Sequence, residues 1–283
     1  MKLLIKFISF ILLAQTASAQ YYYKDIIDAR EATAKQQSYK QNRVRSVDLT
    51  SKDGYDEPEE GFECQQKTSG DYLQITTYTK SKFTPESFQT TSYTASGLIK
   101  ETIDTSKSFY SVTAYQFDAS GQLVDVLNTS TQTDNQAKDI EEHIWQYDKN
   151  HKPEQMIKIK NGSDTTLVHF VLDEKGNIGE ERAEHNHAPL QTIYYYYNDA
   201  GGLTDIVRYN KAAGRMLPDF IFSYDQGDNA GKLTSMIVVP EGSADYQRWV
   251  YIYNEKGLRT QETCVNKQKQ IIGKILYQYT YSK

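Results

Sequence analysis

An aromatic residue, any residue, a second aromatic residue and then Asp or Asn recur along this chain and limit the folds that it can adopt. A weaker first copy has Thr94 in the polar place, and successive copies follow at intervals of 24 to 30 residues. The later copies have their polar residue at Asp118, Asp148, Asp173, Asn198, Asp225 and Asn254. Alternating aromatic residues place both rings on one face of a β-strand. The chain is therefore predicted to be built from β-hairpins.

A turn signal follows the second aromatic residue of each repeat. Asp or Asn at the first position of a type I turn bonds to backbone groups ahead of it. Glycine three residues later adopts the left-handed conformation that closes a hairpin with a bulge. Five copies have that glycine: Gly97, Gly121, Gly176, Gly201 and Gly257. The turn after Asp148 lacks it, and the turn after Asp225 is longer, with Gly231 in the delayed place.

These patterns predict an all-β fold, an antiparallel meander of hairpins that forms a curled or barrel-like sheet. The first strand or hairpin is expected from Cys64, so residues 64–283 are assigned to one β-repeat domain. Residues 20–63 lack the repeat and are assigned to an N-terminal arm or linker, irregular or helical. Its helix formers have little apolar stripe, which favours a surface helix or a mobile arm. The last strand must be paired or covered, because exposed edges invite aggregation.

The first residues have the layout of a secretory signal peptide. Lys2 and Lys6 precede a short apolar run, and small residues at 17 and 19 predict cleavage after Ala19. The run is short for a membrane span, which needs ~20 residues, and no second apolar stretch follows. We therefore expect a signal peptide over residues 1–19 and no stable membrane span after cleavage. The chain is expected to be exported, to the periplasm, the cell surface or the medium.

The repeated Tyr-Asp-x-x-Gly-x-Leu pattern resembles the YD repeats of Rhs-like secreted proteins. It covers about Tyr93 to Lys283, and the Arg that often follows the glycine in that family is Gln122, Asn177 or Gly202 here. The closer resemblance is to short secreted YD-repeat hairpin proteins of Bacteroidota, a family without assigned function. The resemblance implies a β-hairpin fold and, more distantly, carbohydrate binding.

Four consecutive tyrosines, Tyr194 to Tyr197, mark the candidate binding surface. On a strand, Tyr195 and Tyr197 should point into the sheet packing, and Tyr194 and Tyr196 should point the other way. An exposed aromatic pair on a sheet face is typical of a contact surface. Tyr194 and Tyr196 are therefore the predicted ligand-binding residues.

The composition argues against nucleic acid as a partner, and the absence of known catalytic motifs argues against several enzyme classes. The formal net charge is −5, whereas a nucleic-acid-binding protein needs a basic face, so no nucleic acid is expected. The chain has no nucleophile elbow, HExxH, phosphate-binding loop or dinucleotide fingerprint. No catalytic residue, metal or cofactor is therefore predicted.

Residues 143–187 could still form a metal site or a catalytic site. All five histidines lie in the segment 143–187, at His143, His151, His169, His185 and His187. Zinc sites need three or four converging ligands, and loop histidines are the more ordinary interpretation. Glu180, Glu181 and Glu184 could supply paired carboxylates for work on a sugar. A metal- or carboxylate-dependent glycan hydrolase that uses residues 143–187 is therefore the alternative function.

Two smaller features remain open. Cys64 and Cys264 could form a disulfide in an exported protein, or could be two buried free thiols. Thr165, after Asp164, resembles the short sequon for O-glycosylation in exported Bacteroidota proteins.

The leading hypothesis is a secreted, non-enzymatic binding or scaffold protein. It would recognise a glycan or an envelope protein through an aromatic sheet face. A purely structural envelope protein is a third interpretation, distinguished by self-association without a ligand.

Overall fold

The computed structural model describes residues 21–211, 213–227, 230–240 and 245–282, which form one helix and 19 strands. The predicted signal peptide, residues 1–19, and its cleavage site after Ala19 lie outside these residues. The elements, in chain order, are α1 Lys24–Gln41, β1 Val44–Asp53, β2 Glu63–Thr68, β3 Gln74–Lys80, β4 Ser87–Tyr93, β5 Ile99–Ser106, β6 Phe109–Phe117, β7 Leu123–Gln132, β8 Lys138–Tyr147, β9 Pro153–Lys160, β10 Asp164–Leu172, β11 Ile178–His185, β12 Ala188–Pro189, β13 Ile193–Tyr197, β14 Leu203–Asn210, β15 Arg215–Tyr224, β16 Leu233–Val238, β17 Gln247–Tyr253, β18 Arg259–Asn266 and β19 Ile271–Tyr281.

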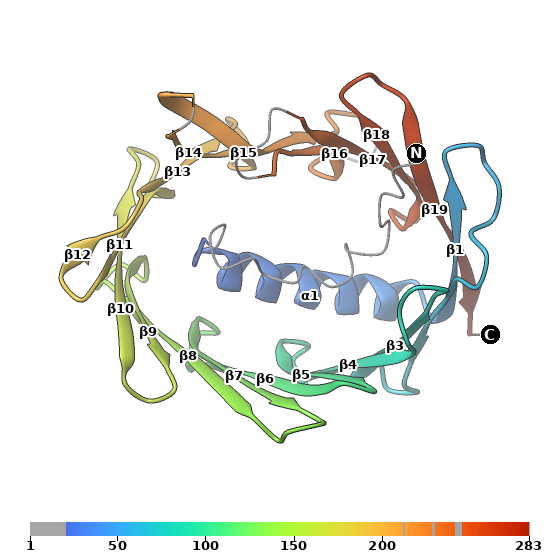
Figure 1. The fold of residues 1–283 in the computed structure, drawn as a ribbon, viewed down its shortest axis with the longest axis horizontal. Coiled ribbons are helices and arrows are strands. Elements are labelled where there is room, and N and C mark those ends of the chain that lie inside the picture. The colour runs from blue at the N-terminus through green and yellow to red at the C-terminus, as the bar shows by residue number, and fades with distance from the viewer. Residues whose placement is uncertain (1–20, 212, 228–229, 241–244, 283) are drawn as a thin grey trace.

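Backbone hydrogen bonds join the strands into a closed antiparallel ring (Figure 1). Strands that follow one another in the chain pair with each other, except that the two-residue β12 pairs with β11 alone and β11 continues the wall by pairing with β13. β1 pairs with both β2 and β19, so the last strand is covered on both sides. The predicted all-β antiparallel meander is confirmed, and its 19 strands close into an 18-strand barrel.

Of the segment predicted to be an N-terminal arm or linker, the described residues 21–63 form part of the barrel and of its lumen. α1 lies across the lumen, and β1 supplies the wall strand between β2 and β19 (Figure 1). Val47 and Leu49 of β1 are buried while Asp48 and Thr50 are exposed, the same alternation that the repeat strands show. Closure requires this strand, because without it the edges of β2 and β19 would be unpaired.

The repeat turns have the predicted structure. Asp118 Oδ1 accepts hydrogen bonds from the backbone N–H groups of Ser120 (2.8 Å) and Gln122 (2.9 Å), and Gly121 has φ 82°. In the repeat without glycine, His151 adopts the left-handed conformation instead, with φ 62°. The Asp148 side chain bonds that turn in the same way, so the turn forms with a strained residue in the glycine position.

Each repeat turn lies beside a register shift in its hairpin, because the strand after the turn carries one extra residue. The shift falls between residues 116 and 117, 146 and 147, 171 and 172, 196 and 197, 223 and 224, and 252 and 253. The extra residue lies on the partner strand, so the two aromatic residues of each repeat keep the alternation of a regular strand and both face inward.

A ladder of tyrosine hydroxyls connects successive hairpins. The second tyrosine of a repeat donates to the carbonyl of the first strand residue after the preceding repeat turn. For example, the Tyr197 hydroxyl donates to Ile178 O at 2.9 Å, and the Tyr224 hydroxyl donates to Leu203 O at 2.7 Å. The same bond joins Tyr147 to Leu123, Tyr253 to Leu233, and Tyr279 to Arg259. These bonds give the repeated tyrosine a structural role, because each one satisfies a carbonyl at a bulge.

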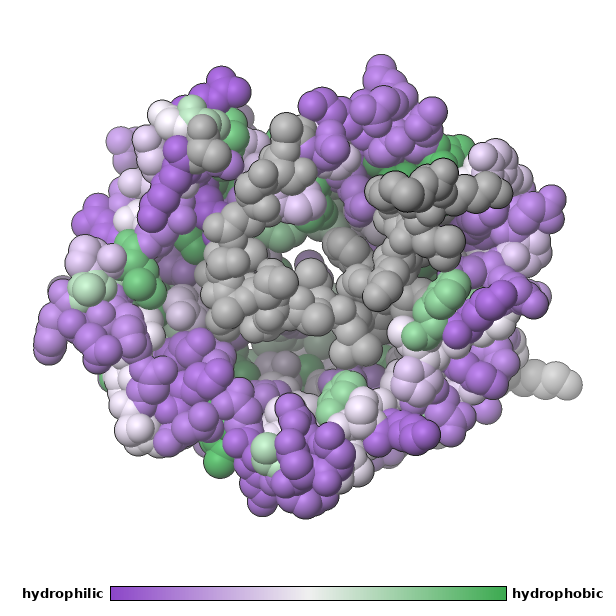
Figure 2. Space-filling view, in the orientation of Figure 1, coloured by the Kyte–Doolittle hydropathy of each residue, from purple (hydrophilic) through white to green (hydrophobic). Residues whose placement is uncertain are grey.

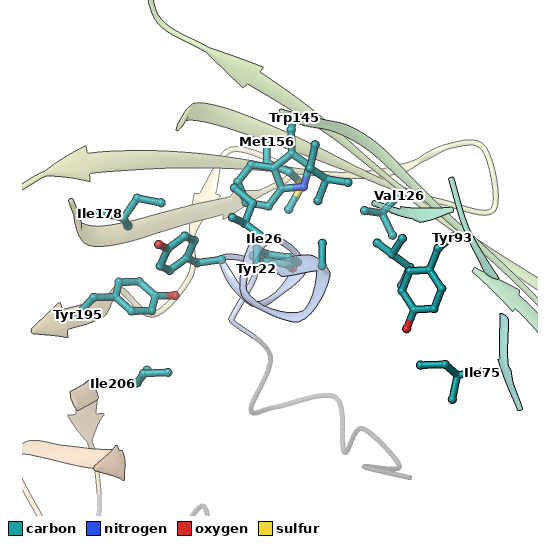
Figure 3. Packing of buried hydrophobic residues seen from close by; sticks show 14 of the residues in the cluster. Tyr22, Ile26, Ile75, Tyr93, Val126, Trp145, Met156, Ile178, Tyr195 and Ile206 are labelled. Atoms are coloured by element: carbon teal, nitrogen blue, oxygen red, sulfur yellow. The ribbon is translucent and has the colours of Figure 1, made fainter. Parts of the chain in front are cut away.

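The main hydrophobic core lies where α1 meets the wall. Figure 3 shows Tyr22 and Ile26, at the start of the helix, among Trp145, Met156 and Ile178 of the wall. Met156 is fully buried, and the Trp145 ring stacks on Phe170 at 5.0 Å. A second, smaller core cluster surrounds Trp249, Tyr251 and Cys264 on β17 and β18. The described residues on the face of the barrel drawn in Figure 2 are mostly hydrophilic.

Removing one rung of the tyrosine ladder should weaken the barrel. We expect Tyr224→Phe to lower the free energy of unfolding by about 1 kcal/mol, because a half-buried carbonyl loses its donor. Urea unfolding followed by tryptophan fluorescence measures this change. Tyr196→Phe is the matched control, since its ring lies on the outer face and is 52% exposed. Equal losses in the two variants would contradict a structural role for the ladder.

Candidate functional site

The carboxylate of Glu181 holds the start of α1 against the wall. It projects from β11 into the lumen, is 1% exposed, and accepts hydrogen bonds from the backbone N–H groups of Tyr22 (2.9 Å) and Tyr23 (3.0 Å). The Tyr195 hydroxyl donates to the same carboxylate at 2.7 Å. The N-cap residue Tyr23 has no side-chain cap of its own. Glu181 therefore caps the helix from a distant strand, at the end where an acceptor is favourable.

Burial controls the charge of this group. It raises the pKa of Glu181 to about 7, although the bonds from Tyr22, Tyr195 and Tyr23 act in the opposite direction and favour the charged form. The carboxyl of Glu181 therefore changes protonation near neutral pH.

A second polar cluster ties the first turn of α1 to β8. Asp25 Oδ2 lies 2.7 Å from His143 Nδ1 and accepts a hydrogen bond from Trp145 Nε1 at 3.1 Å. His143 Nε2 lies 3.0 Å from Glu141, which also pairs with Lys158 at 2.9 Å. Both ring nitrogens of His143 are therefore engaged by carboxylates.

The two carboxylates favour a charged imidazole. Burial disfavours the charged form, but the hydrogen bonds and charges of Asp25 and Glu141 outweigh it and raise the pKa of His143 to about 9. Burial also acts against the ionised form of Glu141. Its bonds to His143 and Lys158 outweigh burial and lower the pKa of Glu141 to about 2. At neutral pH the cluster therefore pairs a buried, charged imidazole with the partly buried charges of Glu141 and Lys158.

The structure disperses the five histidines that are adjacent in the sequence. His143 faces the lumen, His151 lies in a repeat turn, and His169 is exposed on β10. His185 ends β11, and His187 lies in the turn that follows. Among the residues that the structure describes, no group of three or more His, Cys, Asp or Glu side chains could hold a metal ion.

The carboxylates of β11 do not converge either. Glu181 faces the lumen, whereas Glu180 is on the opposite face and pairs with Arg182 at 2.6 Å. Glu184 shares the outward face with Glu180, because it lies four residues further along the strand. The predicted pair for acid–base work is therefore divided between the two faces of one strand.

A solvent-open cavity of about 480 Å³ lies between one face of α1 and the ends of several wall strands, and we call it the rim cavity. The helix contributes Ile26, Arg30, Thr33 and Gln37, which share a face at spacings of three and four residues. The small side chains of Ala29 and Ala34 on the same side leave the space open.

Repeat turns form the opposite side of the rim cavity. Gln122, Lys152 and Asn177 each follow the left-handed residue of their turn, and all three line the cavity. Phe117 and Tyr147 provide aromatic surface. The sequence did not indicate this site, because the helix and the turns are distant in the chain. Three polar residues that follow the left-handed turn positions, Gln122, Lys152 and Asn177, are visible in the sequence, but nothing there shows that they lie together.

Tyr194 and Tyr196 lie on the outer face of the barrel, as their alternation predicts. Tyr195 is 3% exposed and Tyr197 packs against the core, whereas Tyr196 is 52% exposed. Tyr194 pairs with Val207 across β13 and β14, so an aliphatic side chain lies beside it. Neither outward tyrosine lines the rim cavity. Ligand binding by this pair remains a prediction.

The structure holds the two cysteines apart. Both are buried free thiols, Cys64 on β2 and Cys264 on β18. β1 and β19 lie between these strands, and neighbouring strands are ~4.8 Å apart. The separation of about 14 Å exceeds the ~7 Å Cα limit of a disulfide. Cys64 instead contacts the Thr79 hydroxyl. The structure therefore does not contain the disulfide that the sequence permits.

Thr165 lies on the outward face of β10 and is exposed. Its position is accessible to a modifying enzyme, and its glycosylation remains a prediction.

Comparison with known proteins finds no family. No protein-family model matches the chain, and no curated protein matches it. A porin-like protein from Bacteroides uniformis superimposes with a TM-score of 0.41 at 9% identity, over 84% of this chain and 97% of that one. A protein of unknown function from Nostoc punctiforme gives a TM-score of 0.16 at 8% identity, over 86% and 98%. Both scores are too low to support an inference. The resemblance to YD-repeat proteins therefore remains a prediction.

Within the described part of the chain, α1 is too polar to qualify as a membrane-crossing helix.

The attachment of α1 should make stability depend on pH. The folded pKa of Glu181, about 7, lies above its unfolded value of ~4.3, so its contribution is lost as pH rises through 7. The folded pKa of His143, about 9, lies above its unfolded value of ~6.5, so its contribution is lost as pH rises through 9. Both groups therefore lower the free energy of unfolding as pH increases.

Urea unfolding at about pH 5, 7 and 9 tests this expectation. We expect Glu181→Gln to flatten the dependence between about pH 5 and 7, and His143→Gln to flatten it between about pH 7 and 9. His169→Gln is the matched control, because His169 is exposed on the outer face. An unchanged slope in both lumen variants would show that these groups do not hold the helix.

Proposed function

We propose that this chain is an exported, non-enzymatic binding protein whose barrel presents recognition surfaces to a glycan or an envelope partner. The observation that supports this most directly is the use of the inward acid and base groups. Glu181, His143 and Asp25 are all engaged in attaching α1 to the wall.

Catalysis by these groups would require that they reach a substrate. A general base must lie within hydrogen-bond reach of the proton that it removes. Both nitrogens of His143 are already bonded to carboxylates, and the Glu181 carboxylate is enclosed by Tyr22, Tyr23 and Tyr195. This arrangement supports a structural role for the lumen groups and leaves recognition to the surfaces.

The outer face of β13 and β14 is the first candidate surface. Tyr196 and Tyr209 are both about half exposed on this face. Tyr194 lies on the same face, where it is flanked by Glu180 of β11 and Val207 of β14. Tyrosine rings bind the apolar faces of sugar rings, and their hydroxyls provide polar contacts. Asp205, which pairs with Tyr196, adds an acceptor for sugar hydroxyls.

A glycan array with the purified chain tests this surface. We expect Tyr194→Ala combined with Tyr196→Ala to weaken glycan binding by roughly thirtyfold, since each aromatic contact contributes about 1 kcal/mol and the two losses sum to about 2 kcal/mol. Tyr110→Ala is the matched control, because Tyr110 is also an outward tyrosine, 46% exposed, on the distant strand β6. Unchanged glycan binding by the double variant would show that this face is not the binding surface.

Two further measurements on the same purified chain separate the competing functions. Release of shortened sugars from a bound glycan, abolished by Glu180→Gln or Glu184→Gln, would favour a glycan hydrolase. Concentration-dependent self-association without binding to any glycan would favour a purely structural envelope protein.

A further inference from the structure

We propose that the rim cavity binds a small anionic sugar, with its acid group on Arg30 and Lys152 and its hydroxyls on Gln122 and Asn177. This site is separate from the outer tyrosines, so its test does not depend on the function proposed above. The cavity volume of about 480 Å³ lies within the range of ~300–1,000 Å³ that is usual for small-molecule sites.

The charges of the cavity lining have one sign. Arg30 and Lys152 line it, and no Asp or Glu is among the described residues that do so. This is notable in a chain whose formal net charge is −5. A low-dielectric concave surface lined by one sign of charge concentrates ligands of the opposite charge.

The acids of the three turns that line the cavity are bonded within those turns. Asp118, Asp148 and Asp173 each use Oδ1 to accept two backbone hydrogen bonds from their own turn, at 2.8 to 2.9 Å. The Ser120 hydroxyl and the turn backbone lower the pKa of Asp118, and backbone hydrogen bonds lower the pKa of Asp148 and Asp173, so the three carboxyls remain charged and bonded to the turns. They position the turns, and none of them forms an ion pair with Arg30 or Lys152 in the described part of the chain, although the charge of Lys152 helps to lower the pKa of Asp148.

Arg30 is the most informative residue of the site. It is exposed into the cavity and makes no ion pair with any residue in the described ranges, whereas Lys24 on the same helix pairs with Asp28 at 2.7 Å. Its charge lies close enough to Tyr147 and Tyr197 to oppose the rise in their pKa that burial causes. A guanidinium offers a planar pair of donors that matches a carboxylate or phosphate.

The uncharged groups are arranged for a hydroxyl-rich ligand. Gln122 is held by two contacts with His151: its Nε2 donates to the carbonyl at 2.8 Å, and its Oε1 lies 3.0 Å from Nδ1. Asn177 is held by Asp173 Oδ2 at 3.1 Å. Phe117 and Tyr147 add aromatic surface on which a sugar ring can stack. Amides fixed in place lose less conformational entropy when they bind.

The repeat supplies an internal comparison. Lys152 and Lys232 occupy the same position, directly after the left-handed residue of their turns. Lys152 lines the cavity, whereas Lys232 lies outside it, 6.0 Å from the centre of the Tyr253 ring. Lys232→Ala is therefore a matched control, because it removes the same charge from an equivalent turn.

Calorimetric titration of the purified chain with glucuronate, glucose 6-phosphate and glucose tests the proposal. We expect one or both anionic sugars to bind and glucose to bind much more weakly. Arg30→Gln and Lys152→Ala should each weaken the anion by roughly tenfold to a hundredfold, because each removes a charge-assisted hydrogen bond. Lys232→Ala should leave the affinity unchanged.

The outcomes are distinct. Selective binding of glucuronate identifies a carboxylate ligand, and selective binding of glucose 6-phosphate identifies a phosphate ligand. Equal binding of glucose, no binding of either anion, or affinities that neither Arg30→Gln nor Lys152→Ala changes would overturn the proposal. Lys152 is exposed in a turn, so its variant keeps the test valid even if Arg30→Gln fails to fold.

Discussion

The closed ring of backbone hydrogen bonds is the constraint on which the rest of the structure depends. β1 pairs with β2 on one side and β19 on the other, so the wall has no edge to protect. A ring of about 8 strands can be filled by its own side chains, whereas one of about 18 strands encloses more space than they can fill. α1 occupies part of that space. Its polar groups then need partners from the wall, which explains why Glu181 and His143 face inward.

Local structure could be predicted from the sequence because it depends on neighbouring residues. The turn at Asp118, the left-handed Gly121 and the alternation of Tyr195 and Tyr196 follow from rules that act over a few positions. The position of α1 could not be predicted in this way. A helix with little apolar stripe indicates a surface location, and only the inward carboxylates and tyrosines of distant strands make its burial favourable.

Closure and the rim cavity were unpredictable for the same reason. The pairing of Leu49 with Tyr277 joins positions far apart in the chain, and nothing in the local pattern of either strand specifies it. Local patterns did permit two chemistries that the three-dimensional arrangement does not support. His143 and His169 lie on opposite sides of the wall, and Cys64 and Cys264 are separated by two strands. Proximity in sequence says little about convergence when consecutive side chains alternate between faces.

The repeat separates positions that build the barrel from a position that is available for recognition. The turn acid and the second tyrosine make the same bonds in successive hairpins, as Asp173 and Tyr197 illustrate. The residue after the left-handed position makes its repeated bonds through the backbone alone, and its side chain varies from Gln122 to Lys152 along the chain. Its side chain can therefore change the chemistry of the rim without disturbing the hairpins.

The helix connects the anchor to the rim cavity. Glu181 fixes Tyr22 and Tyr23, and Arg30 follows two helical turns later on the same rigid element. The position of the guanidinium is therefore determined by a carboxyl that changes protonation near neutral pH and that projects from β11, whose first residue, Ile178, also lines the cavity. A binding residue carried on a helix anchored in this way needs no supporting contact of its own, which explains how Arg30 can remain exposed inside a barrel without an ion pair to any residue that the structure describes.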